Sequence, residues 1–234
     1  MKNSTQNLTR SSRNGFTLIE MLVVLVIIST LIGIGAQVMK NATSAQGTDT
    51  GASMAESLFA EARGMAKTSG VSTRVVIYEG GGTGEEREKH LRYMGIVRQY
   101  LNNGGTPGDP SDDTYTWSDR LESRGVELPK NVYFNANLSG DPNTMDVQIP
   151  GISGPQSCYY YEFNAEGILA DPVGSVPAVF AVQSGVLYPT DDTPREAKKG
   201  SREVSGFAIW KRGNTTMFRN PDQIPGLGNG DPTF

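Results

Sequence analysis

The sequence predicts an α+β protein, in which one long N-terminal helix is followed by an antiparallel β-sheet domain. Three observations support this fold class. Residues 16–39 form a nearly continuous apolar run, apolar residues then recur at helical spacing up to Met65, and the pattern changes to alternation after Gly70. With 234 residues, the chain is long enough for one sizeable hydrophobic core.

The apolar run at residues 16–39 is long enough to cross a bilayer. As a helix it would extend roughly 36 Å, against a hydrocarbon core of ~30 Å. Lys2, Arg10 and Arg13 precede it and no acid does, so the N-terminus is expected in the cytoplasm and the remainder across the membrane. Glu20 is the one charged residue of the run. A carboxylate in a membrane segment costs about 2.5–3.5 kcal/mol, so a partner and a task are expected for it.

Two simpler interpretations of this segment stay open. An ordinary secretory signal would end in a cleavage site of small residues, which Gly33, Gly35 and Ala36 imitate. The length of the run and the presence of Glu20 oppose that interpretation. The other alternative is a plain membrane anchor that happens to contain a glutamate.

The residues around position 15 resemble the type IV prepilin cleavage and methylation motif. A glycine closes a basic leader, Phe opens the mature chain, Glu is its fifth residue and an apolar helix follows. The residues that carry the resemblance are Arg13-Asn14-Gly15-Phe16-Thr17-Leu18-Ile19-Glu20. In that family a membrane-embedded aspartyl prepilin peptidase cuts after the glycine and N-methylates the new first residue. The resemblance implies cleavage between Gly15 and Phe16 and methylation of Phe16.

Cleavage after Gly15 would also give Glu20 a role. Cleavage would free an amine at the end of an apolar helix, and Glu20 can pair with such an amine on a neighbouring subunit. Two charges that are each unfavourable in lipid would become one hydrogen-bonded ion pair. We therefore expect Glu20 to act in assembly.

The resemblance divides the chain into a prepilin leader (1–15), a transmembrane and assembly helix (16–39), a helix continuation (40–69) and a periplasmic β-rich globular domain (70–234). In the continuation, Gly47 and Gly51 are expected to be weak points of the helix. The helix is expected to end at Gly70. The stripe that should pack on the sheet comprises Met54, Leu58, Ala62 and Met65, flanked by Phe59 and Ala66.

Alternating patterns predict the strands. Residues 71–78 and 91–100 should form a hairpin around the glycine-rich turn at 80–84. Further strands are expected at 132–135, 159–163, 179–183, 206–210 and 215–219, the last two joined by a turn at Gly213 and Asn214. The order resembles the family of the H-type minor pseudopilin of type II secretion and the FimT pilins. Its short matches are residues 61–66 leading into 71–78, and residues 128–132, 163–167 and 209–213.

No catalytic motif was found, so an enzyme, a cofactor and a metal site are not expected. His90 follows the charge run at 85–89 and should lie on the surface. Cys158 should be a small buried residue. Asp109, Asp112 and Asp113 share one loop, and a solvated acidic loop is favoured there over a calcium site.

The leading prediction is a minor pilin or pseudopilin subunit of a type II secretion or type IV pilus filament. It would be a single-pass protein of the bacterial inner membrane with its C-terminal domain in the periplasm, and its partners would be prepilin peptidase and other pilin or pseudopilin subunits. The alternative is a DNA-binding minor pilin of a DNA-uptake pilus, with Lys211, Arg212 and Arg219 as candidate DNA-binding residues. The formal charge of −4 opposes general nucleic-acid binding. A membrane-anchored enzyme is the third and least favoured reading.

Overall fold

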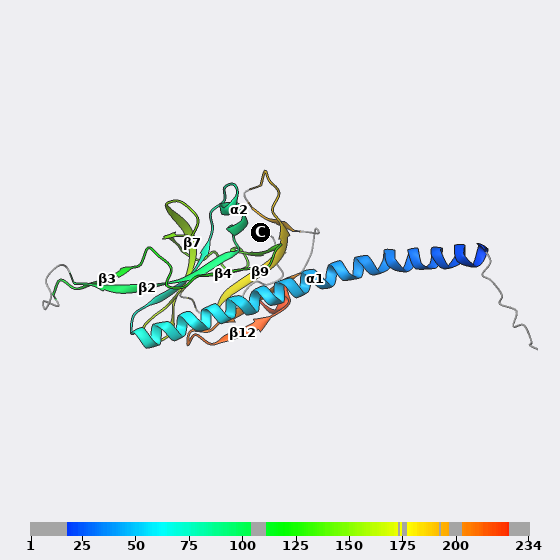
Figure 1. Ribbon diagram of the computed structural model, residues 1–234. Coiled ribbons are helices and arrows are strands. Elements are labelled where there is room, and N and C mark those ends of the chain that lie inside the picture. Colours follow the sequence, from blue (N-terminus) through cyan, green and yellow to red (C-terminus); the bar gives the residue numbers. More distant parts are fainter. Residues whose placement is uncertain are drawn as a thin grey trace, which may run out of the picture. The chain divides into compact units, whose positions relative to one another are not determined.

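The computed structural model describes residues 18–103, 111–172, 174, 177–191, 193–196 and 203–224, and for residues 31–45 it describes the backbone alone. The chain divides into two compact units, residues 1–42 and residues 43–234. We call the second of them, residues 43–234, the globular unit. The fold is α+β, with an N-terminal helix and antiparallel sheets, as the sequence predicts (Figure 1). Its helices are α1 (Leu18–Ser69), α2 (Glu85–Lys89) and the 3-10 helix η1 (Pro221–Gln223).

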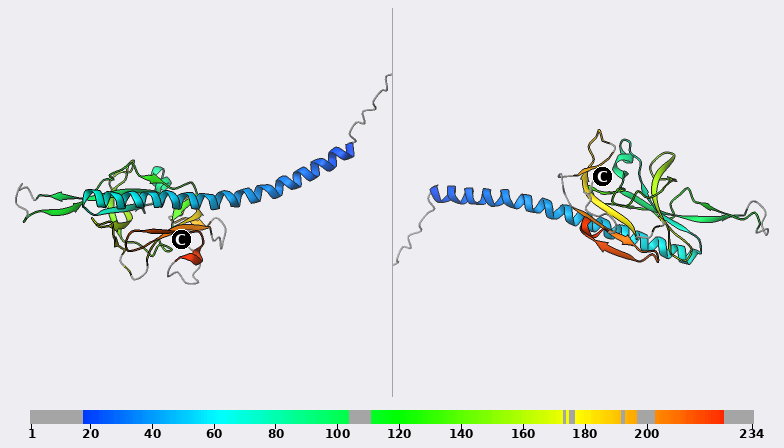
Figure 2. Two further views of the ribbon diagram at one scale, coloured as in Figure 1. Left: turned by 90° about the horizontal axis from the view of Figure 1, so that it is seen from below. Right: turned by 180° about the vertical axis from the view of Figure 1, so that it is seen from behind.

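The C-terminal part of α1 packs along the sheets of the globular unit through one face (Figures 1 and 2). Its buried apolar side chains recur at helical spacing and are Ala52, Ala55, Leu58, Phe59, Ala62 and Ala66. The predicted stripe is therefore confirmed at its centre, whereas Met54 and Met65 are half-buried at its margin. Gly70 ends the helix as expected, because it adopts φ 70° and its N–H donates to the carbonyl of Ala66 at 3.0 Å.

The larger sheet contains seven strands within the described residues, in the order β3-β2-β1-β7-β6, with β4 paired to β2 and β8 paired to β7. All of these pairs are antiparallel. The strands are β1 (Thr73–Tyr78), β2 (Tyr93–Asn102), β3 (Thr114–Trp117), β4 (Val126–Glu127), β6 (Thr144–Gln148), β7 (Pro155–Phe163) and β8 (Leu169–Asp171).

Both faces of this sheet are covered. Alternate side chains such as Val75, Met94 and Tyr161 join the core formed with α1. The intervening side chains, including Val76 and Cys158, join a second cluster on the outer face with Val147, Ile149 and Ile152. This double burial explains why β1 is a run of apolar residues as well as an alternating strand.

The smaller sheet contains five described strands in the order β10-β9-β11-β12, with β5 paired to β9. They are β5 (Val132–Phe134), β9 (Ala178–Val186), β10 (Arg195–Glu196), β11 (Val204–Ile209) and β12 (Thr215–Phe218). Phe180 and Phe207 from this sheet contact Phe59 of α1, with ring centroids 5.3 and 5.1 Å away. The sequence predicted that α1 packs on a single sheet. This prediction was wrong, because the buried face of α1 contacts two sheets.

Gly47 and Gly51 allow the close approach of α1 to the segment around β5. A Cβ atom at Gly51 would lie 3.2 Å from Val132 Cγ1 and 3.3 Å from Leu128 Cδ2. A Cβ atom at Gly47 would lie 3.3 Å from Val132 Cγ2. The helix runs through both positions without a break. Close packing, rather than a weak point in the helix, accounts for these glycines.

Gly51→Leu should lower the free energy of unfolding by about 1–3 kcal/mol, because the new side chain would overpack the contact with Val132 and Leu128. Gly64 provides the matched control in the same helix, since nothing lies within 4 Å of its Cβ position. Gly64→Leu should raise the free energy of unfolding by up to about 1 kcal/mol through helix propensity. Urea denaturation of a fragment beginning at Gln46 measures both changes. Equal effects at the two positions would contradict the close packing.

His90 is buried, with 5% of its surface exposed, so the expected surface position was wrong. The charge run that precedes it is helix α2, and the His90 N–H closes this helix by donating to the carbonyl of Glu86 at 3.0 Å. The chain then leaves the helix and the ring turns inward. Its Nδ1 lies 2.7 Å from the carbonyl of Gly80 and therefore donates to it, which fixes the glycine-rich turn.

Candidate functional site

The two residues predicted for processing, Gly15 and Phe16, lie outside the described residues. Glu20 lies in the first turn of α1 and is exposed. The unsatisfied N–H groups at a helix N-terminus carry a partial positive charge, which favours a carboxylate in the first turn. The position of Glu20 is thus compatible with a charged side chain at the start of an otherwise apolar helix.

The first described turns of α1 expose apolar side chains on every side. Between Leu18 and Ile28 each large apolar side chain is at least 44% exposed, and Leu18 reaches 84%. A water-soluble helix normally shows a polar face, whereas a helix that is apolar all round belongs in a protein core or in lipid. Apolar exposure of this extent marks a surface that is covered by other molecules.

The predicted membrane segment, residues 16–39, is only partly covered by the described side chains, which stop at Thr30 and resume at Gln46. Within the described part of the chain, no helix is both long enough and apolar enough to cross a membrane.

The structure separates the three residues predicted for DNA binding. Lys211 and Arg212 are exposed and adjacent in the turn between β11 and β12, whereas Arg219 follows the other end of β12. The carbonyl of Arg212 accepts a hydrogen bond from Arg63 Nη2 of α1 at 2.7 Å. Arg219 Nε lies 3.3 Å from a carboxylate oxygen of Asp49. The three cations therefore do not form one cluster.

The other residues considered for chemistry are placed as follows. Cys158 is fully buried in the outer-face cluster, and this burial, with smaller effects of Glu79 and Asp146, raises the pKa of its thiol to about 12. It is therefore no nucleophile at neutral pH. Asp109 lies outside the described residues, and Asp112 and Asp113 precede β3. The described residues contain no group of His, Cys, Asp or Glu side chains that could hold a metal ion.

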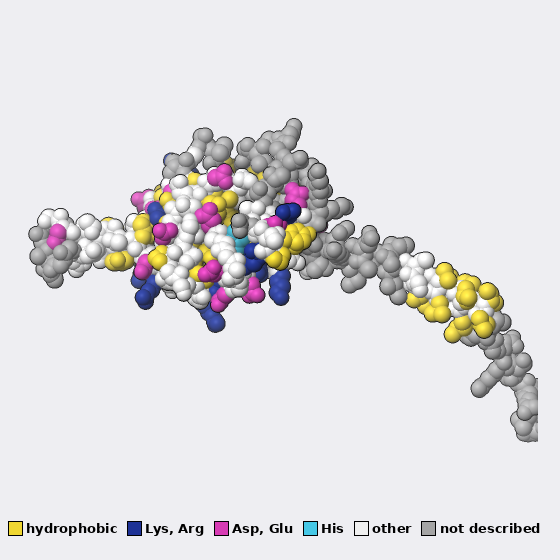
Figure 3. All heavy atoms as spheres, turned by 90° about the horizontal axis from the view of Figure 1, so that it is seen from above, with side chains coloured by type: hydrophobic (Ala, Val, Ile, Leu, Met, Phe, Trp, Pro, Cys, Tyr) yellow, Lys and Arg dark blue, Asp and Glu magenta, His cyan; other side chains and the backbone are white. Residues whose placement is uncertain are grey.

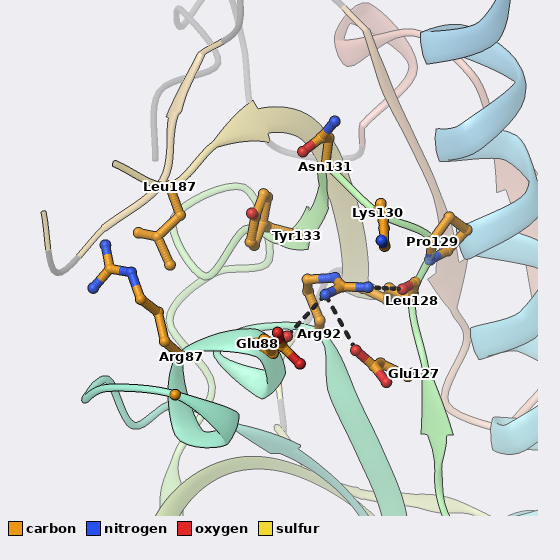
Figure 4. A pocket seen from close by; sticks show the side chains of 11 residues that line it. Arg87, Glu88, Arg92, Glu127, Leu128, Pro129, Lys130, Asn131, Tyr133 and Leu187 are labelled. Atoms are coloured by element: carbon orange, nitrogen blue, oxygen red, sulfur yellow. Dashed lines mark hydrogen bonds and ion pairs between the residues drawn. The ribbon is translucent and has the colours of Figure 1, made fainter. Parts of the chain in front are cut away.

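A surface hollow of about 750 Å³ lies between α2, the loop before β5 and Leu187 (Figure 4). Arg87, Arg92 and Lys130 contribute positive charge to it, and Glu88 and Glu127 contribute negative charge. Sequence reasoning missed this cluster, because its cations are spread over more than forty positions and two of them lie in or beside a run interpreted as solvated.

The side chain of Arg92 is 12% exposed and already has several partners. It lies 3.1 Å from Glu127 Oε1 and donates to the carbonyls of Glu88 and Leu128 at 2.8 and 2.7 Å (Figure 4). The described lining residues include no Ser, Cys or His, and the carboxylate of Glu127 is paired with Arg92. Arg92 therefore links α2, through Glu88, to the loop before β5, through Leu128. This role is structural.

Residues 10–36 match the prokaryotic N-terminal methylation motif. No curated protein and no solved structure matches the chain. The motif indicates a type IV pilin-like or pseudopilin precursor, and it supports prepilin cleavage and N-methylation. It implies processing by a prepilin peptidase and assembly with other pilins. It also suggests a membrane-anchored structural subunit rather than an enzyme.

Proposed function

We propose that the chain is a minor pilin or pseudopilin of a type II secretion or type IV pilus filament, nearest in kind to the H-type and FimT subunits. One observation carries this proposal: the methylation motif at residues 10–36 leads into a helix whose apolar side chains are exposed on every side. A helix of this kind needs lipid before assembly and other helices after it. A filament subunit experiences both environments.

In this proposal the chain is made as a precursor and is cut between Gly15 and Phe16 on the cytoplasmic side. The new amine of Phe16 is methylated. Residues 16–39 then hold the protein in the inner membrane by a single pass, with the globular unit in the periplasm. The basic residues before the apolar run support this orientation.

Assembly places the apolar helices of neighbouring subunits side by side. The carboxylate of Glu20 pairs with the methylated amine of Phe16 on a neighbour. This pair sets the axial register, because any other offset of the two helices would leave both charges unpaired in an apolar environment.

Gly15→Val tests the proposed processing. A peptidase that cuts after Gly15 must bring its catalytic groups close to the backbone there, and a branched side chain blocks this approach. The variant should keep its leader, whereas Asn14→Val, one residue further from the cut, should be processed. The mobility and intact mass of membrane-extracted protein distinguish the two forms. Normal processing of Gly15→Val would count against the proposed cleavage site.

A further inference from the structure

The distal parts of β2 and β3 form a two-stranded arm, defined as residues 99–102 and 114–117. Strand β1 pairs with β2 only as far as Thr73 opposite Arg98, and β2 is the one described neighbour of β3. Within the arm, Leu101 lies opposite Tyr115 and Gln99 lies opposite Trp117. In the three ribbon views the arm projects past the C-terminal end of α1 (Figures 1 and 2).

The arm carries most of the exposed apolar side chains of the globular unit. Among the described residues from 43 onward, five large apolar side chains are exposed, and three of them are on the arm: Tyr100 (49%), Leu101 (46%) and Tyr115 (60%). Leu101 and Tyr115 share one face, and Tyr100 lies on the other. Figure 3 shows the arm as a narrow extension with apolar side chains on its surface. Trp117, at the base of the arm, packs against the outer-face cluster, whereas Tyr100, Leu101 and Tyr115 are exposed.

Among the described residues, the edges of the arm lack the usual protection against pairing. Exposed edge strands of soluble proteins are normally guarded by charged residues, Pro or a bulge. The eight residues of the arm include no charged residue and no Pro. An isolated two-stranded ribbon is also only marginally stable in water. An uncharged, aromatic ribbon with open edges is therefore suited to pair with and pack against another protein.

The base of the arm is held in a fixed direction. The guanidinium of Arg74 lies 3.9 Å from the ring centroids of both Trp117 and Tyr160. The same guanidinium forms a half-buried ion pair with Glu162 at 2.8 Å. Trp117 is thereby attached to the outer face of the larger sheet, so the arm reaches a partner with little loss of conformational freedom.

We propose that the arm docks onto the globular unit of the next pilin-type subunit along the filament, an inference that rests on the proposed function. The methylation motif at residues 10–36 implies assembly with other pilins, so a neighbouring subunit is the protein that the exposed arm meets in a filament. The partner chemistry is an open strand edge, which adds to β3, beside an apolar recess for Leu101 and Tyr115.

In vivo photo-crosslinking of the full chain tests this proposal. A photoreactive phenylalanine analogue is placed at Tyr115, at Val24 in the apolar helix, and at Trp210, which is 49% exposed away from the arm. Tyr115 should crosslink to a pilin-type subunit about tenfold more than Trp210 does, as expected for a contact at the centre of an interface. Tyr115→Ser should reduce incorporation into filaments by about tenfold, and Trp210→Ser should not.

The possible outcomes distinguish a failure of the docking proposal from a failure of the proposed filament function. Crosslinks from Val24, with Tyr115 no better than Trp210, would overturn the docking arm and leave the filament function in place. An absence of subunit crosslinks from both Val24 and Tyr115 would overturn the filament function, and the docking arm with it. Crosslinks from Tyr115 to lipid alone would also overturn the proposal that the arm docks onto another subunit.

Discussion

Glu20→Ala should be cleaved, methylated and inserted into the membrane, yet be nearly absent from filaments. The variant leaves the methylated amine of a neighbouring Phe16 without its proposed partner in a site of low dielectric constant. Breaking a buried ion pair in this way costs on the order of 3–5 kcal/mol. Insertion of the monomer should become easier, because the cost of about 2.5–3.5 kcal/mol for a carboxylate in the membrane is removed.

Intersubunit crosslinking and a cleavage assay in the same cells measure this prediction. Glu61→Ala is the matched control, because Glu61 is an exposed carboxylate of the same helix within the globular unit. This control should be processed and assembled normally. Normal crosslinking by Glu20→Ala would refute the pairing mechanism. A loss of cleavage in that variant would assign Glu20 to processing instead.

Phe59→Ala should remove about 3–5 kcal/mol from the free energy of unfolding of the globular unit. Phe59 is 1% exposed, and its ring centroid lies 5.1 Å from those of Tyr161 and Phe207 and 5.3 Å from that of Phe180. It is therefore where α1 meets both sheets. The loss would be a large part of the 5–15 kcal/mol that is usual for a folded domain.

Urea denaturation of a fragment beginning at Gln46 measures this loss. The fragment keeps the contacts of Thr48 and Asp49 with Ser205. Tyr115→Ala is the control, because its aromatic side chain is 60% exposed on the arm and should change stability by less than about 0.5 kcal/mol. A loss below 1 kcal/mol for Phe59→Ala would show that α1 is not the centre of the core.

The sequence predicted the parts of the fold that have a strong local period. The end of α1 at Gly70 and the strands β1, β2, β5, β7, β9, β11 and β12 follow from apolar spacing and turn residues. The short strands β3, β4, β6, β8 and β10 were missed, because two to five residues of mixed polarity carry no clear alternation.

The pairing of strands that are far apart in the sequence also could not be predicted from local patterns. Strand β1 pairs with β7, and Thr73 lies opposite Phe163, so nothing near either residue in the sequence identifies its partner. The burial of His90 depends on the helix end that turns its ring inward. The arm formed by β2 and β3 was missed because its exposure follows from where β1 stops pairing with β2, which is a property of the sheet rather than of the residues.

The proposed processing and assembly residues are close together in the sequence, so they could be proposed from a local motif. Gly15, Phe16 and Glu20 fall within the matched segment 10–36. The candidate DNA-binding residues were a different case. Their closeness in sequence suggested a cluster, but the hairpin places Arg219 at the opposite end of β12 from Lys211 and Arg212.

The intact mass of the membrane-extracted protein, with N-terminal peptide sequencing, shows directly whether residues 1–15 are removed as a prepilin leader. We predict a mature chain that begins at Phe16 and carries one methyl group on its terminal amine, with residues 1–15 removed. A mature N-terminus near Ala36 would contradict the account, because the apolar helix would then be a conventional signal peptide and could not enter a filament.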